Sequence, residues 1–139
     1  MIFELETAIK TKLEATNKFV NVYDTHTLKS DWYPYCTFEL SSFDWKYLDS
    51  CTNERDFIFN LVMLHTINAD FTRDTAKDIL YRALEDVIER FDGDMDLSES
   101  TIVRGKVLTW EMGVLVEWEW QTLVLNVNIS LTVVTTAQQ

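Results

Sequence analysis

Three groups of residues in this chain have side chains that could do chemistry, and the first is acidic. Residues 92–96 read Asp-Gly-Asp-Met-Asp, which resembles the opening of a calcium-binding EF-hand loop. Such a loop needs Gly at its sixth position and Glu at its twelfth, where this chain has Leu97 and Val103. We therefore expect a polar loop after a helix end, and no metal-binding residues.

The second group contains the two histidines and the two cysteines. Neither His26 nor His65 has a second His or a Cys at the spacing of a metal site, and neither cysteine lies in a nucleophile motif. His65 is at an odd position of its strand, like the apolar residues of one face, which predicts a partly buried histidine whose ring is hydrogen-bonded. Two buried thiols are favoured for Cys36 and Cys51, while a disulfide across a hairpin centred at residues 43–44 stays open. We expect no catalytic residue, no cofactor and no enzyme activity.

The third group is aromatic and acidic. Tryptophans are clustered between residues 110 and 120, with glutamates beside them, and a weaker aromatic group begins at residue 32. Large aromatic side chains dominate both protein cores and subunit interfaces, so both interpretations stay open. The candidate interface residues are Trp110, Glu117, Trp118, Glu119, Trp120, Trp32 and Tyr33.

The composition bounds the class of protein. A length of 139 residues with 47% hydrophobic residues predicts a single globular domain, 1–139. The net charge is −11, and no Lys or Arg follows Lys106, so the chain lacks the basic clusters that grip nucleic acid. The first residues do not resemble a signal peptide, and no apolar run has the roughly 18 residues of a membrane span. These features predict a cytoplasmic protein without membrane contact.

Apolar spacing predicts the elements that must position these groups. Residues 3–16 have apolar side chains at helical spacing, with Asn17 as a plausible stop, and residues 19–23 resemble a short strand. A second strand is expected at 32–40, with Pro34 at its start or on an edge. Residues 41–44 are then expected to turn the chain.

The strongest pattern lies in the middle of the chain. Residues 57–67 form a strand that is apolar on both faces, which requires a cover on each side. Residues 72–91 form an amphipathic helix with a continuous apolar stripe, and Gly93 fits its stop position. Pairs of opposite charge four residues apart, such as Asp78 and Arg82, indicate that the other helix face is solvated.

The last third of the chain is expected to be β-structure. A strand spans residues 102–110, and a turn is predicted at Gly113. Apolar residues then occupy even positions from 114 to 120 and odd positions from 123 to 133, so a bulge or turn is required near residues 121–122. The predicted fold class is α+β: a mostly antiparallel sheet with two main helices, about 3–16 and 72–91, packed on one face.

This pattern resembles a known family. A strand opening with Tyr33-Pro34-Tyr35 leads to Asn53-Glu54-Arg55, which opens the long strand. The helix then repeats Ala76-x-x-Ile79-Leu80-x-x-Ala83-Leu84-x-x-Val87-Ile88, and an alternating Val/Ile/Leu hairpin closes the chain. Most of the chain is similar in this way to the tail terminator (tail completion, or minor tail) proteins of long-tailed bacteriophages.

The resemblance implies a structural role in virion assembly. Subunits of that family form a six-membered ring that caps the tail tube, stops its polymerisation and provides the head-attachment surface. The implied partners are other copies of the chain, the tail tube protein and a head-completion or connector protein, first in the host cytoplasm and then in the virion tail. Another head–tail joining or tail component, or a small-molecule-binding α+β domain, is the alternative. The resemblance assigns no role to the Trp-rich segment or to the cysteines.

Overall fold

The computed structural model describes residues 2–26, 33–47, 52–68, 70–98, 101–117 and 120–136. Two helices and six strands follow one another in the order α1, β1, β2, β3, α2, β4, β5, β6. Their bounds are α1 Ile2–Ala15, β1 Asn21–Tyr23, β2 Tyr35–Tyr47, β3 Thr52–Ile67, α2 Arg73–Phe91, β4 Gly93–Ser98, β5 Thr101–Glu117 and β6 Trp120–Thr136. The α+β fold class is therefore confirmed.

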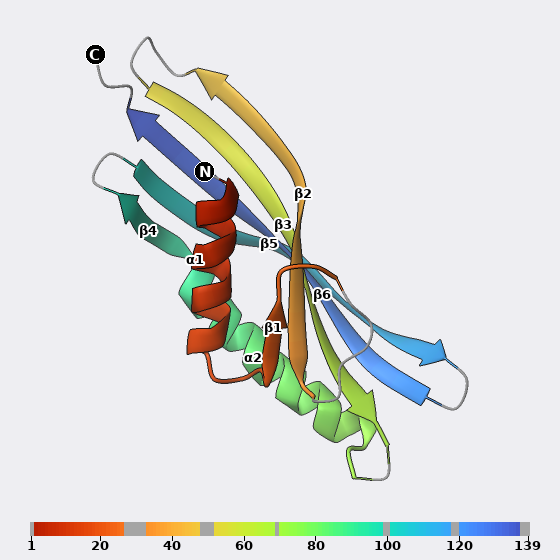
Figure 1. The fold of residues 1–139 in the computed structure, drawn as a ribbon. Helices are drawn as coiled ribbons and strands as arrows, with labels where there is room; N and C mark the ends of the chain where they lie inside the picture. The colour runs from red at the N-terminus through yellow and green to blue at the C-terminus, as the bar shows by residue number, and fades with distance from the viewer. Residues whose placement is uncertain are drawn as a thin grey trace.

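The strands form one sheet in the order β1-β2-β3-β6-β5-β4. Every neighbouring pair is antiparallel except β1 and β2, which are parallel. Figure 1 shows a long, twisted sheet with both helices on the same side and the β5–β6 hairpin end extending beyond them at the lower right. The helices therefore cover the middle of the sheet and leave that hairpin end uncovered.

One hydrophobic core joins the helices to the sheet. The odd-numbered side chains of β3 and β6 supply one wall, and the apolar stripes of α1 and α2 supply the other. The central members are fully buried: Leu5, Ile9, Leu13, Phe59, Leu61, Met63, Leu80, Val87, Leu125, Val127 and Ile129. Burying each of these side chains contributes about 1.5–3 kcal/mol relative to exposure, so this layer decides which face of each strand points inward.

Local signals end the helices close to where the sequence predicts. Asn17 has a left-handed φ of 57° just after α1. Thr72 caps α2, because its Oγ1 accepts a hydrogen bond from the Thr75 amide at 3.3 Å. At the other end, the Lys12 ammonium of α1 donates to the Arg90 carbonyl at 3.2 Å, which ties the two helices together. Gly93 begins β4.

The turn expected at residues 41–44 is wrong. β2 continues to Tyr47, and a β-bulge between Leu40 and Ser42 absorbs one extra residue without ending the strand. Cys36 consequently pairs in register with Met63, so the hairpin that would have brought the two cysteines together does not exist. Cys51 lies outside the described residues.

The turn expected at Gly113 is also wrong. Gly113 lies inside β5 and pairs with Val124 of β6. Glu117 pairs with Trp120, so the chain reverses between these two residues and β6 then runs without interruption. In such a hairpin, even-numbered side chains on β5 point to the same face of the sheet as odd-numbered side chains on β6. The apolar residues therefore change from even to odd positions although they stay on one face. The bulge lies instead on β5, between Val107 and Thr109.

The segment 92–96, expected to be a polar loop, is mostly strand. β4 pairs antiparallel with the first residues of β5, with Gly93 opposite Gly105. Aspartate disfavours strands, so the segment gave no strand signal. Charged residues are nevertheless common on edge strands, where they discourage pairing with other chains.

Candidate functional site

The described candidate interface residues lie on the β5–β6 hairpin and just before β2. Trp110 is on β5, half-exposed at 48%, with its ring edge-on to Tyr81 of α2 at 5.7 Å. Glu117 and Trp120 form the last pair of the β5–β6 ladder. Trp118, Glu119 and Trp32 lie outside the described residues. The structure therefore places three of the seven candidates on one hairpin.

Tyr33 lies just before β2. Its ring is 5.3 Å from that of Tyr35 and 6.2 Å from that of His65. His65 is in register with Leu123 of β6, near the start of that strand. Tyr33 is thus close to the β3–β6 side of the hairpin base, while Trp110 is on β5.

Exposed aliphatic side chains on β5 were missed at the sequence level. Leu108 is 43% exposed, Val114 37% and Val116 62%. The interface residues predicted in this segment were aromatic or acidic, although the even-position pattern already contained Val114 and Val116. With Trp110, these residues form an apolar strip along β5, which we call the β5 strip.

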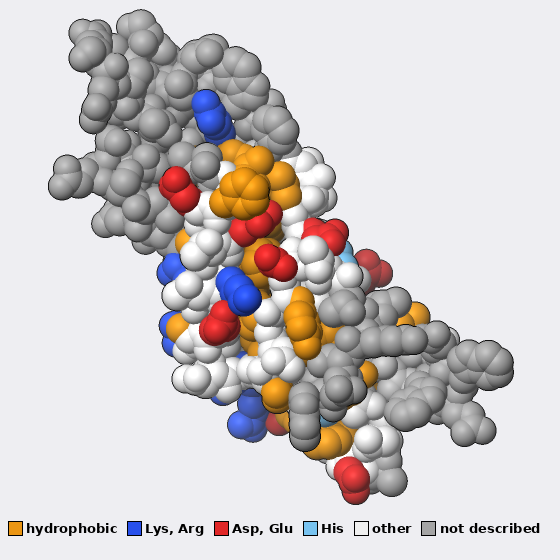
Figure 2. All heavy atoms as spheres, in the orientation of Figure 1, with side chains coloured by type: hydrophobic (Ala, Val, Ile, Leu, Met, Phe, Trp, Pro, Cys, Tyr) orange, Lys and Arg blue, Asp and Glu red, His pale blue; other side chains and the backbone are white. Residues whose placement is uncertain are grey.

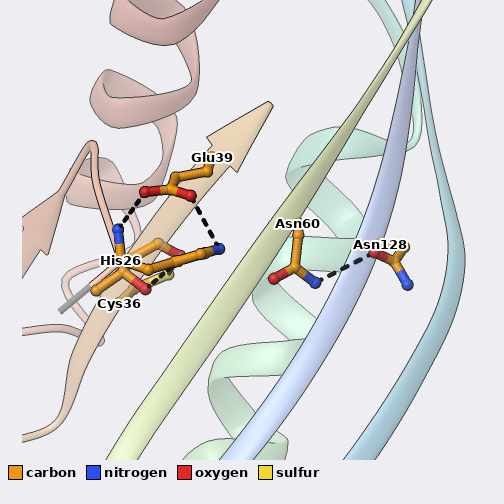
Figure 3. A network of polar contacts seen from close by, with 6 residues as sticks. His26, Cys36, Glu39, Asn60 and Asn128 are labelled. Atoms are coloured by element: carbon orange, nitrogen blue, oxygen red, sulfur yellow. Dashed lines mark hydrogen bonds and ion pairs between the residues drawn. The ribbon is translucent and has the colours of Figure 1, made fainter. Parts of the chain in front are cut away.

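His26 fastens the segment after β1 to strand β2. Its backbone amide donates to Glu39 Oε1 at 2.9 Å, and its Nδ1 is 2.8 Å from Thr37 Oγ1 (Figure 3). Its Nε2 lies 4.0 Å from Glu39 Oε2. These contacts are made at the surface by a partly exposed pair, so their role is to hold a loop against an edge of the sheet.

His65 behaves as its strand parity predicts and is more deeply buried than expected. It is 1% exposed, and its Nδ1 is 2.9 Å from the Thr66 carbonyl. The Phe71 ring packs against it at 4.7 Å. A histidine enclosed by aromatic rings and a backbone carbonyl is a packing residue.

Polar side chains cross the sheet on the face opposite the helices. Asn60 of β3 donates to Asn128 of β6 at 3.2 Å (Figure 3). Asn128 in turn donates to Thr109 of β5 at 3.1 Å. Thr132 donates to Asp56 at 2.6 Å in the same pair of strands, β3 and β6. These cross-strand hydrogen bonds link three strands and make this face more polar than the core face.

Cys36 is a buried thiol without a disulfide partner. Burial raises the pKa of this thiol well above its usual range, because the apolar surroundings disfavour the thiolate. Across the parts of the chain that the structure describes, no three His, Cys, Asp or Glu side chains are grouped so as to hold a metal ion.

We expect Cys36 to resist alkylation in the folded protein. A thiol-reactive label applied at pH 8 and followed by peptide mass spectrometry should leave Cys36 unmodified, because only the thiolate reacts. The same label in denaturant should modify it fully, since the unfolded thiol regains its ordinary pKa. Rapid labelling of Cys36 under native conditions would mean that β2 opens readily at this position.

Two shallow hollows accompany the exposed apolar side chains. One, of ≈ 320 Å³, lies between α1 and β1 and is lined by Lys10, Glu14, Phe19, Val20, Asn21 and Val22. The other, of ≈ 310 Å³, lies on the hairpin and is lined by Glu111, Met112, Gly113, Val114, Leu115, Val124 and Asn126. Both are at the small end of the range of ligand sites, about 300–1,000 Å³. Neither lining contains a His or a Cys.

Comparisons with known proteins give a likeness at the level of the fold. No protein-family model and no curated protein matches the sequence. Among solved structures, a chain of the virion of a native gene transfer agent (GTA) particle aligns with 90% of this chain and 85% of its own length. The TM-score is 0.50 and the sequence identity is 16%. The two chains share a fold. No helix within the described ranges has the length and apolar character needed to cross a membrane.

Proposed function

We propose that this chain is a structural subunit of a phage-like virion. The observation that carries the proposal is the fold shared with a chain of a virion particle over 90% of the length of this chain. A subunit of this kind works through the surfaces that it presents to neighbours, and the β5 strip is an apolar surface available for that purpose.

We propose more specifically that the chain is a tail terminator. In this role six copies would form a ring on the end of the tail tube, stop its growth and present a surface to the head-completion or connector protein. The pattern of the long strand and of the helix after it supports this role. The net charge of −11 also supports it, since an acidic subunit repels DNA that passes close by. The role is not catalytic, and it places the protein in the host cytoplasm during assembly and in the virion tail afterwards.

The tail terminator role can be tested on tubes assembled from a phage tail tube protein. Added in excess, the chain should produce shorter tubes, each ending in a ring that negative-stain electron microscopy can resolve. A second acidic protein of similar size serves as the control for nonspecific effects. Tubes of unchanged length, without a ring at either end, would contradict the role. A chain that stays monomeric with tubes and binds a metabolite would favour the small-molecule-binding alternative.

A further inference from the structure

β5 has a long free edge. β4 accompanies β5 only as far as Gly105, which pairs with Gly93. From Lys106 to Glu117, the ladders of the described strands give β5 a partner only on its β6 side. The Val107 amide donates to Asp92 Oδ1 at 3.2 Å. Beyond it, an edge strand of this length presents backbone N–H and C=O groups that can pair with another chain.

Exposed apolar side chains are concentrated in two places. The structure gives eight large hydrophobic side chains that are exposed, and four of these form the β5 strip. Three others belong to α1 and to the segment that leads into β1: Ile2 at 37%, Phe3 at 82% and Val20 at 55%. Figure 2 shows apolar side chains gathered over α1 and near β1. The β5 strip and the second group lie on different elements, so the strip of one copy can bind the second group of another copy.

Of the second group, Val20 lines the hollow between α1 and β1. Phe19 and Val20 line it on one side, and Lys10 and Glu14 of α1 line it on the other. β1 is the edge strand of the described sheet and pairs with β2. An extended strand can add to an edge of this kind while its side chains enter the adjoining groove. We call this surface the α1–β1 groove.

The charges of the two surfaces are complementary. The β5 edge from Lys106 to Glu117 carries Glu111 and Glu117 against Lys106, a net charge of −1. Residues 10–23 carry Lys10, Lys12 and Lys18 against Glu14, which is a net positive segment in a chain of net charge −11. Lys10 and Lys18 are exposed. Copies of an acidic chain repel one another, so a contact between a positive and a negative surface is the favoured approach.

We propose that the β5 strip of one copy docks into the α1–β1 groove of the next copy. This inference rests on the ring of the proposed function and assigns its subunit contact to named surfaces. Because the two surfaces are different, the contact is head-to-tail, and repetition of such a contact closes into a ring when the rotation between copies permits. An isologous contact, by comparison, would stop at a dimer.

A mixing experiment tests the head-to-tail contact. Val116→Arg damages the β5 strip and leaves the groove intact, while Val20→Arg damages the groove and leaves the strip intact. Each variant alone should be monomeric by size-exclusion chromatography with light scattering, because a buried guanidinium weakens such a contact by about thirtyfold or more. An equimolar mixture should form a dimer and nothing larger, since only one intact strip and one intact groove can meet.

Controls separate this contact from folding and from the proposed function. Ser41→Arg, an exposed position in neither surface, should assemble as the unmodified chain does. A second pair, Glu111→Lys and Lys10→Glu, changes exposed side chains: each alone should weaken association, and the two in one chain should restore part of it. This pair of charge reversals still tests the contact if either arginine variant has a lowered melting temperature.

Several results would overturn the docking proposal. The first is an unmodified chain that stays monomeric up to about 1 mM, a concentration at which even a contact with a millimolar Kd would be populated. The second is an arginine variant that assembles as the unmodified chain does. The third is an equimolar mixture of the two variants that stays monomeric. Rings formed by the arginine variants would reject these surfaces and leave the terminator role standing. Tubes that grow uncapped would instead reject the terminator role.

Discussion

Replacing Gly105 with Ala should destabilise the fold by about 3 kcal/mol, the upper part of the range for overpacked positions. A Cβ atom at this position would lie 1.8 Å from the carbonyl oxygen of Phe91 and 2.9 Å from its carbonyl carbon. Both are backbone atoms at the end of α2, so no side-chain rotation can relieve the clash. Either β5 or the end of α2 must move, and both are fixed by the core.

Chemical denaturation of the Gly105→Ala variant measures this loss directly, and the melting temperature should fall by roughly 10 °C. Gly113→Ala on the same strand is the matched control, because an added Cβ there meets no atom within 4 Å. That variant should change stability by less than about 0.5 kcal/mol, and removing a flexible residue from a strand gives a small gain. Equal losses at the two positions would show that the contact with Phe91 is not the cause.

Replacing Phe59 with Ala should cost about 3–5 kcal/mol, as is typical of a large aromatic side chain in a core. Phe59 is fully buried on β3, between Leu40 of β2 and Ile129 of β6 in the sheet register. Its ring contacts that of Phe38 in an edge arrangement at 6.5 Å. Its removal leaves a cavity in a layer where both helices and three strands meet, and such a layer cannot collapse freely.

Ile58→Ala is the matched control for Phe59→Ala. Ile58 is the adjacent residue on β3, partly buried on the face opposite the helices. Equilibrium unfolding should show less than half the loss found for Phe59→Ala, since a smaller, partly buried side chain contributes less apolar burial. A comparable loss at Ile58 would mean that the polar face is covered as tightly as the core face.

The parts of the fold set by periodicity were predictable from the sequence. Both helices begin and end within a residue or two of the predicted 3–16 and 72–91, because their apolar stripes and end signals agree. The central strand, predicted at 57–67, lies within β3, which begins five residues earlier at Thr52 and ends at the predicted residue, for a similar reason. Its odd-numbered side chains form the core face as predicted.

The errors share a physical cause, which is that a local turn signal can be overridden by pairing. Ser41 and Ser42 favour turns, yet a bulge accommodates them within β2. Gly113 favours a turn, yet it pairs with Val124 along a continuous ladder. The acidic residues of β4 disfavour a strand, yet β4 is the edge strand of the sheet, where charged residues are common. These outcomes depend on which strands become neighbours, and single-segment patterns do not contain that information.

The candidate interface was predictable only in part, because it also depends on which strands and helices become neighbours. The aromatic residues of β5 stood out by type, but the exposure of Leu108, Val114 and Val116 follows from the sheet order. β4 ends its pairing at Gly105, so the rest of β5 has an open side. The α1–β1 groove required two elements to be placed side by side, which no local pattern specifies.

The pairing of β3 with β6 also bears on how the chain reaches its fold. These two strands pair along their whole length, while α2, β4 and β5 lie between them in the sequence. During synthesis, β3 therefore has only β2 beside it until the distant β6 has emerged, and the edge that pairs with β6 remains unpaired in that interval. Sheets closed by such distant segments fold in about milliseconds to seconds. The nascent chain should be most prone to aggregation, and most dependent on chaperones, during this interval.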